Sequence, residues 1–172
     1  ADRIKIAAKL AAEQHAKRPV VIIVSAMSKV TDLLLDTLKK AEAGDADGLE
    51  ANLAALTARH LECAQGLLPG DHLDGARKGI EDLTAQFARI ARGMLLLGER
   101  PLRSVDQAIA IGERLSAFLI AQYLNSEKIA AEAVNDGGAV VARATLFVNS
   151  PTVTSVSNDV IVTAALAVPG AI

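Results

Sequence analysis

The hydrophobic pattern begins with a helix that is followed by a buried strand. Over residues 2–17, apolar side chains recur at helical spacing, and charged side chains fill the other positions. Pro19 ends this helix, because proline disfavours helical backbone in the residue before it. The run Val20–Val24 is apolar throughout, which is typical of a central parallel strand covered by helices on both faces. Residues 25–31 then form a small, polar junction into a helix that extends to about residue 43.

A long helical stretch occupies the middle of the chain. Residues 48–97 carry two apolar stripes at helical spacing, separated by the turn signal Leu68-Pro69-Gly70. We interpret them as two antiparallel helices that project from an α/β core, followed by a further helix over about residues 104–125. The stripes consist of Leu49, Leu53, Leu56 and His60 in the first helix and of Leu83, Phe87, Ile90 and Met94 in the second.

Short strands are predicted for the last part of the chain. The pattern places one strand at 131–134 and another at 139–142, with the turn Asn135-Asp-Gly-Gly138 between them. A final strand is expected at 160–168. Because no internal repeat, low-complexity tract or flexible linker is visible, we expect one α/β domain over residues 1–172.

Composition narrows the possible functions. The chain has 172 residues with a formal net charge of −2 and 2% aromatic residues, so neither a basic stripe nor a base-stacking platform for nucleic acid is expected. Cys63 is the only cysteine, which excludes an internal disulfide and favours a cytoplasmic location. The first residues are charged and do not resemble a signal peptide. The longest apolar run, Val160–Val168, is about half the roughly 20 residues that a membrane helix needs, so no membrane association is expected.

The junction Ser25-Ala-Met-Ser-Lys-Val-Thr31 is the first candidate binding segment. In α/β folds ligands gather at the carboxyl ends of strands, and small residues there let the backbone approach a ligand closely. The N–H groups at the start of the following helix favour an anion such as a carboxylate or phosphate. The alternative is structural, since Ser28 or Thr31 could merely cap that helix.

The second candidate segment is Gly112-Glu-Arg-Leu-Ser-Ala117. Glu113 lies in a strongly apolar helix, where an unpaired carboxylate would be costly to bury. A bound ammonium group would be a suitable partner for it. A salt bridge to Arg103 or Arg114 would satisfy the carboxylate equally well.

The two segments, in this order and joined by a helical pair that ends in Leu-Leu-Gly-Glu-Arg-Pro, resemble aspartate kinases of the amino-acid kinase superfamily. The resemblance covers residues 1 to about 134, and Asn149-Ser-Pro151 with Val168-Pro-Gly170 extends it. It implies a three-layer α/β/α fold with a mainly parallel sheet and a helical-hairpin insertion at about 48–97. The long insertion is similar to that of lysine-sensitive monofunctional enzymes and of those fused to homoserine dehydrogenase.

The resemblance also implies an activity. Aspartate kinases use ATP to convert L-aspartate to 4-phospho-L-aspartate, the first step towards lysine, threonine and methionine. By position, Thr31 would hydrogen-bond the bound aspartate, and Glu113 would receive its α-ammonium group. The other substrate-binding residues implied by the resemblance are Ser25 and Ala26, which would form a small-residue loop near the reacting carboxylate, and Arg114 and Ser116, which would shape that side of the pocket.

The sequence departs from the family where phosphate chemistry takes place. Family members begin with a Lys-Phe-Gly-Gly strand and loop and carry a later Gly-Arg-Gly-Gly-Ser-Asp segment, and neither occurs in this chain. Asn135-Asp-Gly-Gly138 stands where the family has Asp-Ala-Arg. We therefore expect a partial kinase domain with little activity alone, and we name no catalytic residue. ATP and Mg²⁺ are expected from the resemblance; a metal site on the protein is not, because His60 and Glu62 point to different faces of a helix.

Two other functional interpretations remain open at this point. One is a catalytically silent module that binds aspartate or a partner subunit, and the other is an amino-acid kinase for another carboxylate such as glutamate. A homo-oligomer is also expected, because family aspartate kinases are oligomers and a partial domain leaves strand edges and apolar faces uncovered.

Overall fold

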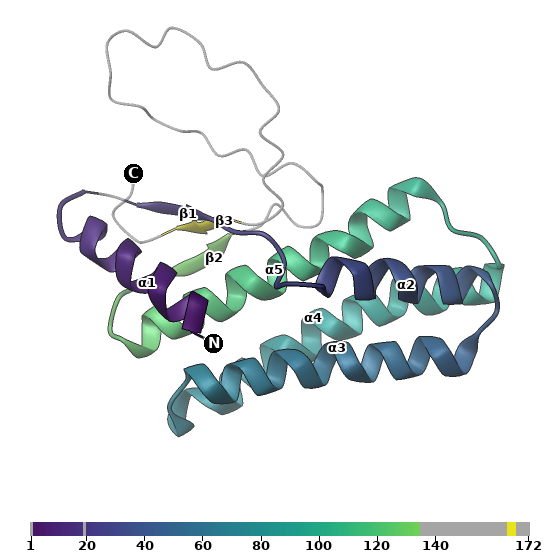
Figure 1. Cartoon of the computed structure of the whole chain (residues 1–172), viewed down its shortest axis with the longest axis horizontal. Coiled ribbons are helices and arrows are strands. Elements are labelled where there is room, and N and C mark those ends of the chain that lie inside the picture. The colour runs from purple at the N-terminus through teal and green to yellow at the C-terminus, as the bar shows by residue number, and fades with distance from the viewer. Residues whose placement is uncertain (1, 19, 135–164, 168–172) are drawn as a thin grey trace, which may run out of the picture.

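The computed structural model describes residues 2–18, 20–134 and 165–167, with only the backbone described for the last three (Figure 1). Helices make up most of this structure, and the strands are short. The helices are α1 (Asp2–His15), α2 (Val30–Glu42), α3 (Ala46–Leu67), α4 (Gly70–Leu97) and α5 (Leu102–Ser126). The strands are β1 (Val21–Ile23), β2 (Glu132–Val134) and β3 (Ala165–Ala167).

Helices α2, α3, α4 and α5 pack on one another and enclose the main hydrophobic core. Figure 1 shows α3 and α4 side by side and running in opposite directions, as their apolar stripes predict. Each helix contributes a stripe of large aliphatic or aromatic side chains, because residues three and four apart share one face of a helix. The largest fully buried side chains are Leu34 and Leu38 of α2, Leu49, Leu56 and His60 of α3, Ile80 and Phe87 of α4, and Ile111, Leu115, Leu119 and Leu124 of α5.

The helix ends follow local sequence signals. Asp45 is the N-cap of α3, and its Oδ1 accepts a hydrogen bond of 2.9 Å from the Gly48 N–H. Pro69 separates α3 from α4, since it cannot donate the backbone hydrogen bond that would continue the helix. Gly98 ends α4 with a φ of 64°, a conformation that glycine adopts without steric cost.

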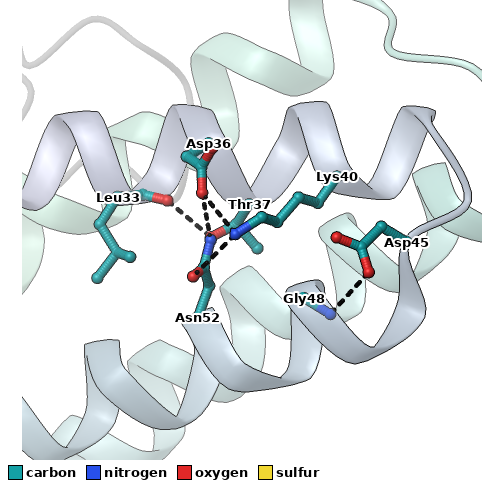
Figure 2. A network of polar contacts seen from close by, with 7 residues as sticks. All are labelled: Leu33, Asp36, Thr37, Lys40, Asp45, Gly48 and Asn52. Atoms are coloured by element: carbon teal, nitrogen blue, oxygen red, sulfur yellow. Dashed lines mark hydrogen bonds and ion pairs between the residues drawn. The ribbon is translucent and has the colours of Figure 1, made fainter.

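A polar network joins α2 to α3 on the exposed side of the helical pack (Figure 2). Asn52 of α3 donates a hydrogen bond of 2.8 Å to the Asp36 carboxylate of α2. The same carboxylate forms an ion pair of 2.9 Å with Lys40, one helical turn further along α2. These two contacts lower the pKa of Asp36, the hydrogen bond from Lys40 being the larger cause. The hydrogen bond from Asn52 thus adds a polar contact between α2 and α3 to their apolar packing.

The sheet is small and lies over the second half of α5 (Figure 1). Its strand order is β1-β3-β2, and both pairings are antiparallel. Ile22 of β1 and Ala133 of β2 pack with Ala8 of α1 and Ile120 of α5 in a second, smaller apolar cluster. Helices α1 and α5 thus cover one face of this sheet.

The predicted three-layer α/β/α fold with a mainly parallel sheet is wrong for the described residues. They are mainly helical, the strands have three residues each, and β3 pairs antiparallel with both neighbours. The strand predicted at Val20–Val24 is also not buried on both faces, because Val21 is 48% and Ile23 54% exposed. The physical reason is that α2, α3 and α4 bury their apolar stripes mainly against one another and against α5, and do not form layers on a sheet.

Several predicted elements lie where the apolar pattern placed them. Helices α1, α2 and α5 lie at the predicted positions, and α3 and α4 form the helical pair predicted at 48–97. Strand β2 falls within the predicted strand at 131–134. β3 falls within the strand predicted at 160–168. The predicted turn Asn135-Asp-Gly-Gly138 and the strand at 139–142 lie outside the described residues.

Candidate functional site

The backbone changes direction within the junction between β1 and α2. Lys29, the N-cap of α2, has left-handed backbone angles with a φ of 60° and a ψ of 7°. The N–H of Val30 donates a hydrogen bond of 2.9 Å to the carbonyl of Met27, which closes the turn. No side chain caps the helix, so the capping role considered for Ser28 or Thr31 is not the one they have.

The second segment lies directly against this junction. Gly112 of α5 is buried, and a Cβ built on it would lie 3.0 Å from the Cβ of Ala26. The same position would be 3.2 Å from Cγ1 of Val30 and 3.1 Å from Cδ1 of Leu34. Any side chain would have to displace these atoms, so the absence of one lets α5 approach the junction closely. The two segments, far apart in the chain, therefore meet at Gly112 and Ala26.

A third element reaches the junction from the helical pair. Nη2 of Arg59, on α3, donates a hydrogen bond of 2.8 Å to the backbone carbonyl of Ser28. Sequence reasoning missed Arg59, because its partner is a backbone atom 31 positions earlier and no local pattern reports such a contact. Gly112, by contrast, could have been singled out from the sequence. A glycine in the interior of a helix weakens the helix, so its presence there can indicate a close packing contact.

The predicted site residues differ in exposure. Ser25 and Thr31 are exposed, Ala26, Glu113 and Arg114 are half-buried, and Ser116 is 3% exposed. Ser116 Oγ is buried without a hydrogen-bond partner in the described structure, which is costly for a hydroxyl group. Because Ser116 is one helical turn beyond Gly112, this hydroxyl lies on the same side of α5 as the contact with Ala26.

Glu113 has none of the protein partners considered for it. It forms no salt bridge or side-chain hydrogen bond with another described residue, so the pairing with Arg103 or Arg114 is not found there. Nη1 of Arg114 instead donates a hydrogen bond of 2.9 Å to Oε1 of Gln86 on α4. Because none of the described cations pairs with it, this half-buried carboxylate is available to a ligand within that part of the chain.

Arg114 lies on a different side of α5 from the junction. It lines a cavity of about 240 Å³ between α4, α5 and β2, together with Asp82 and Phe118. Neither this cavity nor one of about 390 Å³ between α1 and α5 is lined by Thr31 or Glu113. The structure therefore brings the Ser25–Thr31 junction to Gly112 but leaves Arg114 outside that contact.

Metal-binding and membrane-spanning features are not found among the described residues. No group of three or more His, Cys, Asp or Glu side chains gathers there to hold a metal ion. None of the described helices is both long and apolar enough to cross a membrane.

Comparison with known proteins places the chain in a family. Residues 2–166 match the model of the amino acid kinase family. Over 120 residues, 70% of this chain, it is 31% identical to a bifunctional aspartokinase/homoserine dehydrogenase 1, chloroplastic, from Arabidopsis thaliana. Over 119 residues, 69% of this chain, it is 31% identical to a bifunctional aspartokinase/homoserine dehydrogenase, chloroplastic, from Daucus carota. The matched region spans 13% of the length of each of these relatives. The chain therefore belongs to the amino acid kinase family, which the resemblance in its two segments predicts.

Proposed function

We propose that this chain is the aspartate-binding part of an aspartate kinase, which transfers a phosphoryl group from ATP to L-aspartate and forms 4-phospho-L-aspartate. The observation that carries the proposal is the contact between the junction and α5 at Ala26 and Gly112. It joins the two segments that resemble aspartate kinases into one local surface. The names of the relatives from Arabidopsis thaliana and Daucus carota support the choice of aspartate as substrate.

The chemistry of the surface suits a small amino-dicarboxylate. N–H groups at the start of α2 and the exposed hydroxyl of Thr31 are donors for a carboxylate. Glu113 supplies a negative charge for an α-ammonium group, and no described cation competes for it. The buried hydroxyl of Ser116 is a further hydrogen-bond donor or acceptor, on the side of α5 that contacts Ala26. In this role the chain binds and orients the acceptor substrate, which is a large part of catalysis in phosphoryl transfer.

The phosphate-handling half of the reaction is not assigned to these residues. No group of three or more His, Cys, Asp or Glu side chains gathers among the described residues, and the proposal names no Mg²⁺ ligand there. The described residues are proposed to bind the acceptor substrate only. The use of ATP and Mg²⁺ follows from the proposal that the whole protein is an aspartate kinase. A role in the first step of lysine, threonine and methionine synthesis follows from the same proposal.

Calorimetric titration of the chain with L-aspartate, succinate and L-glutamate tests the proposal. Succinate has both carboxylates of aspartate but no ammonium group, so it isolates the role of Glu113. Glu113→Gln should weaken L-aspartate binding about tenfold and leave succinate binding unchanged, because a charge-assisted hydrogen bond is worth about 1.5–3 kcal/mol. Thr31→Val should weaken the binding of both dicarboxylates.

Glu127→Gln provides the matched control for charge. Glu127 is exposed at the end of α5 and away from the junction, so this variant should bind all three ligands as the parent chain does. Absence of saturable L-aspartate binding would refute the proposal. Tighter binding of L-glutamate would move the assignment to another carboxylate substrate. Binding of L-aspartate by a whole protein that shows no aspartate-dependent ATP turnover would favour a binding module over an enzyme.

A further inference from the structure

We propose that Arg59 of α3 is a positioning residue that holds the β1–α2 junction in the shape that binds substrate. This inference rests on the proposed function, and it assigns to the helical pair α3–α4 a part in the site. The observation behind it is the hydrogen bond of 2.8 Å from Arg59 Nη2 to the carbonyl of Ser28. Ser28 immediately precedes Lys29, whose backbone is left-handed.

The junction is attached to the helical pack at three places. Ala26 lies against Gly112 of α5, and the carbonyl of Met27 accepts a hydrogen bond from Val30 of α2. The contact of Arg59 with Ser28 is the attachment that comes from α3. Between these points the chain turns through Lys29, so the orientation of the first N–H groups of α2 depends on all three attachments.

The left-handed backbone of Lys29 explains why an external hydrogen bond matters. A residue with a β-carbon is strained in this region, because its Cβ comes too close to the neighbouring backbone. Such a conformation persists only where the surroundings hold it. The guanidinium of Arg59 holds the carbonyl that precedes the strained residue, so its loss should release Lys29 to an extended or right-handed conformation.

The stability of α2 does not account for the place of Arg59. A cation beside the N-terminus of a helix is unfavourable, because that end already carries partial positive charge. Arg59 is exposed, so packing does not require it there either. An anionic ligand at the junction would interact favourably with both the N-terminus of α2 and the guanidinium of Arg59. This agrees with a substrate carboxylate at this position.

Two measurements on the full chain test the inference. In Arg59→Met, backbone hydrogen exchange of the Val30 amide, which donates to the Met27 carbonyl within the junction, should accelerate about tenfold, which is the effect of losing one charge-assisted hydrogen bond. L-aspartate affinity should fall by a similar factor. Arg59→Lys keeps a charge and a donor and should recover part of both effects. Arg89→Met removes an exposed arginine from α4 and should change neither.

A second substitution at residue 29 separates positioning from a direct charge effect. In the Arg59→Met background, Lys29→Gly should restore most of the L-aspartate affinity, since glycine adopts the left-handed conformation without strain. Lys29→Ala removes the same charge without that freedom and should not restore it.

Each outcome decides the inference. Unchanged hydrogen exchange in Arg59→Met would overturn it. Faster exchange with unchanged affinity would show that the hydrogen bond has no part in binding, which also overturns it. Equal recovery by Lys29→Gly and Lys29→Ala would do the same. If the parent chain binds no L-aspartate, the proposed function fails, and the exchange rates still decide whether Arg59 holds the junction.

Discussion

A Cβ on Gly112 would lie 3.0 Å from the Cβ of Ala26, which makes this glycine the point where α5 meets the β1–α2 junction. Side-chain volume at residue 112 should therefore separate these two elements. The contact involves one residue from each of the segments that resemble aspartate kinases. Its integrity can be measured through stability and through ligand binding.

Gly112→Val should lower the free energy of unfolding by about 1–3 kcal/mol, the usual cost of overpacking a close contact. The variant should also lose affinity for L-aspartate, because the junction must move. Chemical denaturation and calorimetry measure the two effects. Gly93→Ala on α4 is the control, since a Cβ at that position meets nothing within 4 Å. A Gly112→Val chain as stable as the parent would contradict the observed packing.

The packing of α4 on α5 can be tested with two glycines one turn apart. A Cβ at Gly79 would overlap the ring of Phe118, whereas one at Gly75 meets nothing within 4 Å. Gly75→Ala should stabilise the chain by about 0.5–1 kcal/mol, because alanine restricts the unfolded chain and favours helix. Gly79→Ala should lack this gain or lose stability, as followed by thermal or urea unfolding.

A double-mutant cycle identifies the cause at Gly79. In a Phe118→Ala background the overlapping ring is absent, so Gly79→Ala should become as favourable as Gly75→Ala. If Gly79→Ala remains unfavourable without the ring, the overlap with Phe118 is not the reason.

Acid should destabilise the helical pack through His60. This side chain is fully buried, Nδ1 contacts the carbonyl of Leu56 at 2.7 Å, and Nε2 has no hydrogen-bond partner in the described structure. Burial is the largest cause that lowers the pKa of His60 below its usual value of 6.5. The unfolded chain therefore binds the proton more tightly than the folded chain. Stability should be complete above about pH 6.5 and fall by up to about 1.4 kcal/mol per pH unit below it.

Urea unfolding between about pH 5 and 7.5 measures this slope, a range that lies above the usual titration of carboxylates. His60→Leu should be nearly independent of pH in the same range. His72→Gln, which changes a half-buried histidine near the start of α4, should keep the slope of the parent chain. A parent chain with no loss of stability between pH 6.5 and 5 would show that His60 is not held neutral by burial.

The start of α3 depends on a single capping side chain. Asp45→Ala should destabilise the chain by about 0.5–2 kcal/mol, because it removes the acceptor of the Gly48 N–H. Asp47→Ala removes an acidic residue from the first turn of the same helix without removing a cap, so its effect should be smaller. Equal effects of the two substitutions in thermal unfolding would mean that charge, and not the cap, stabilises the helix.

The helices could be predicted from the sequence because their signals are local. Apolar residues at spacings of three and four, Pro69 between α3 and α4, and Gly98 at the end of α4 are visible without knowledge of the fold. The interpretation of Val20–Val24 was wrong for a related reason. A short apolar run states that a segment can be buried but not which element covers it, and here only one face of β1 packs on α1 and α5.

The candidate site was only partly visible in the sequence. The two segments that meet at Ala26 and Gly112 could be singled out, because small residues after a strand and an acidic residue in an apolar helix are unusual locally. The place of Arg114 beside Gln86, and the contact of Arg59 with Ser28, could not. Both depend on which helix faces lie together, and many packings satisfy the same apolar pattern.

The sequence by itself determined the helix positions, the family and the two segments with unusual chemistry, since these depend on residue type and spacing along the chain. The tertiary structure decided that the helices pack on one another, that the described strands pair antiparallel, and that α3 reaches back to the β1–α2 junction. The physical reason is that burial is non-directional, so hydrophobic pattern shows what must be covered. Close contacts and hydrogen bonds between distant residues then select one arrangement among those that cover it.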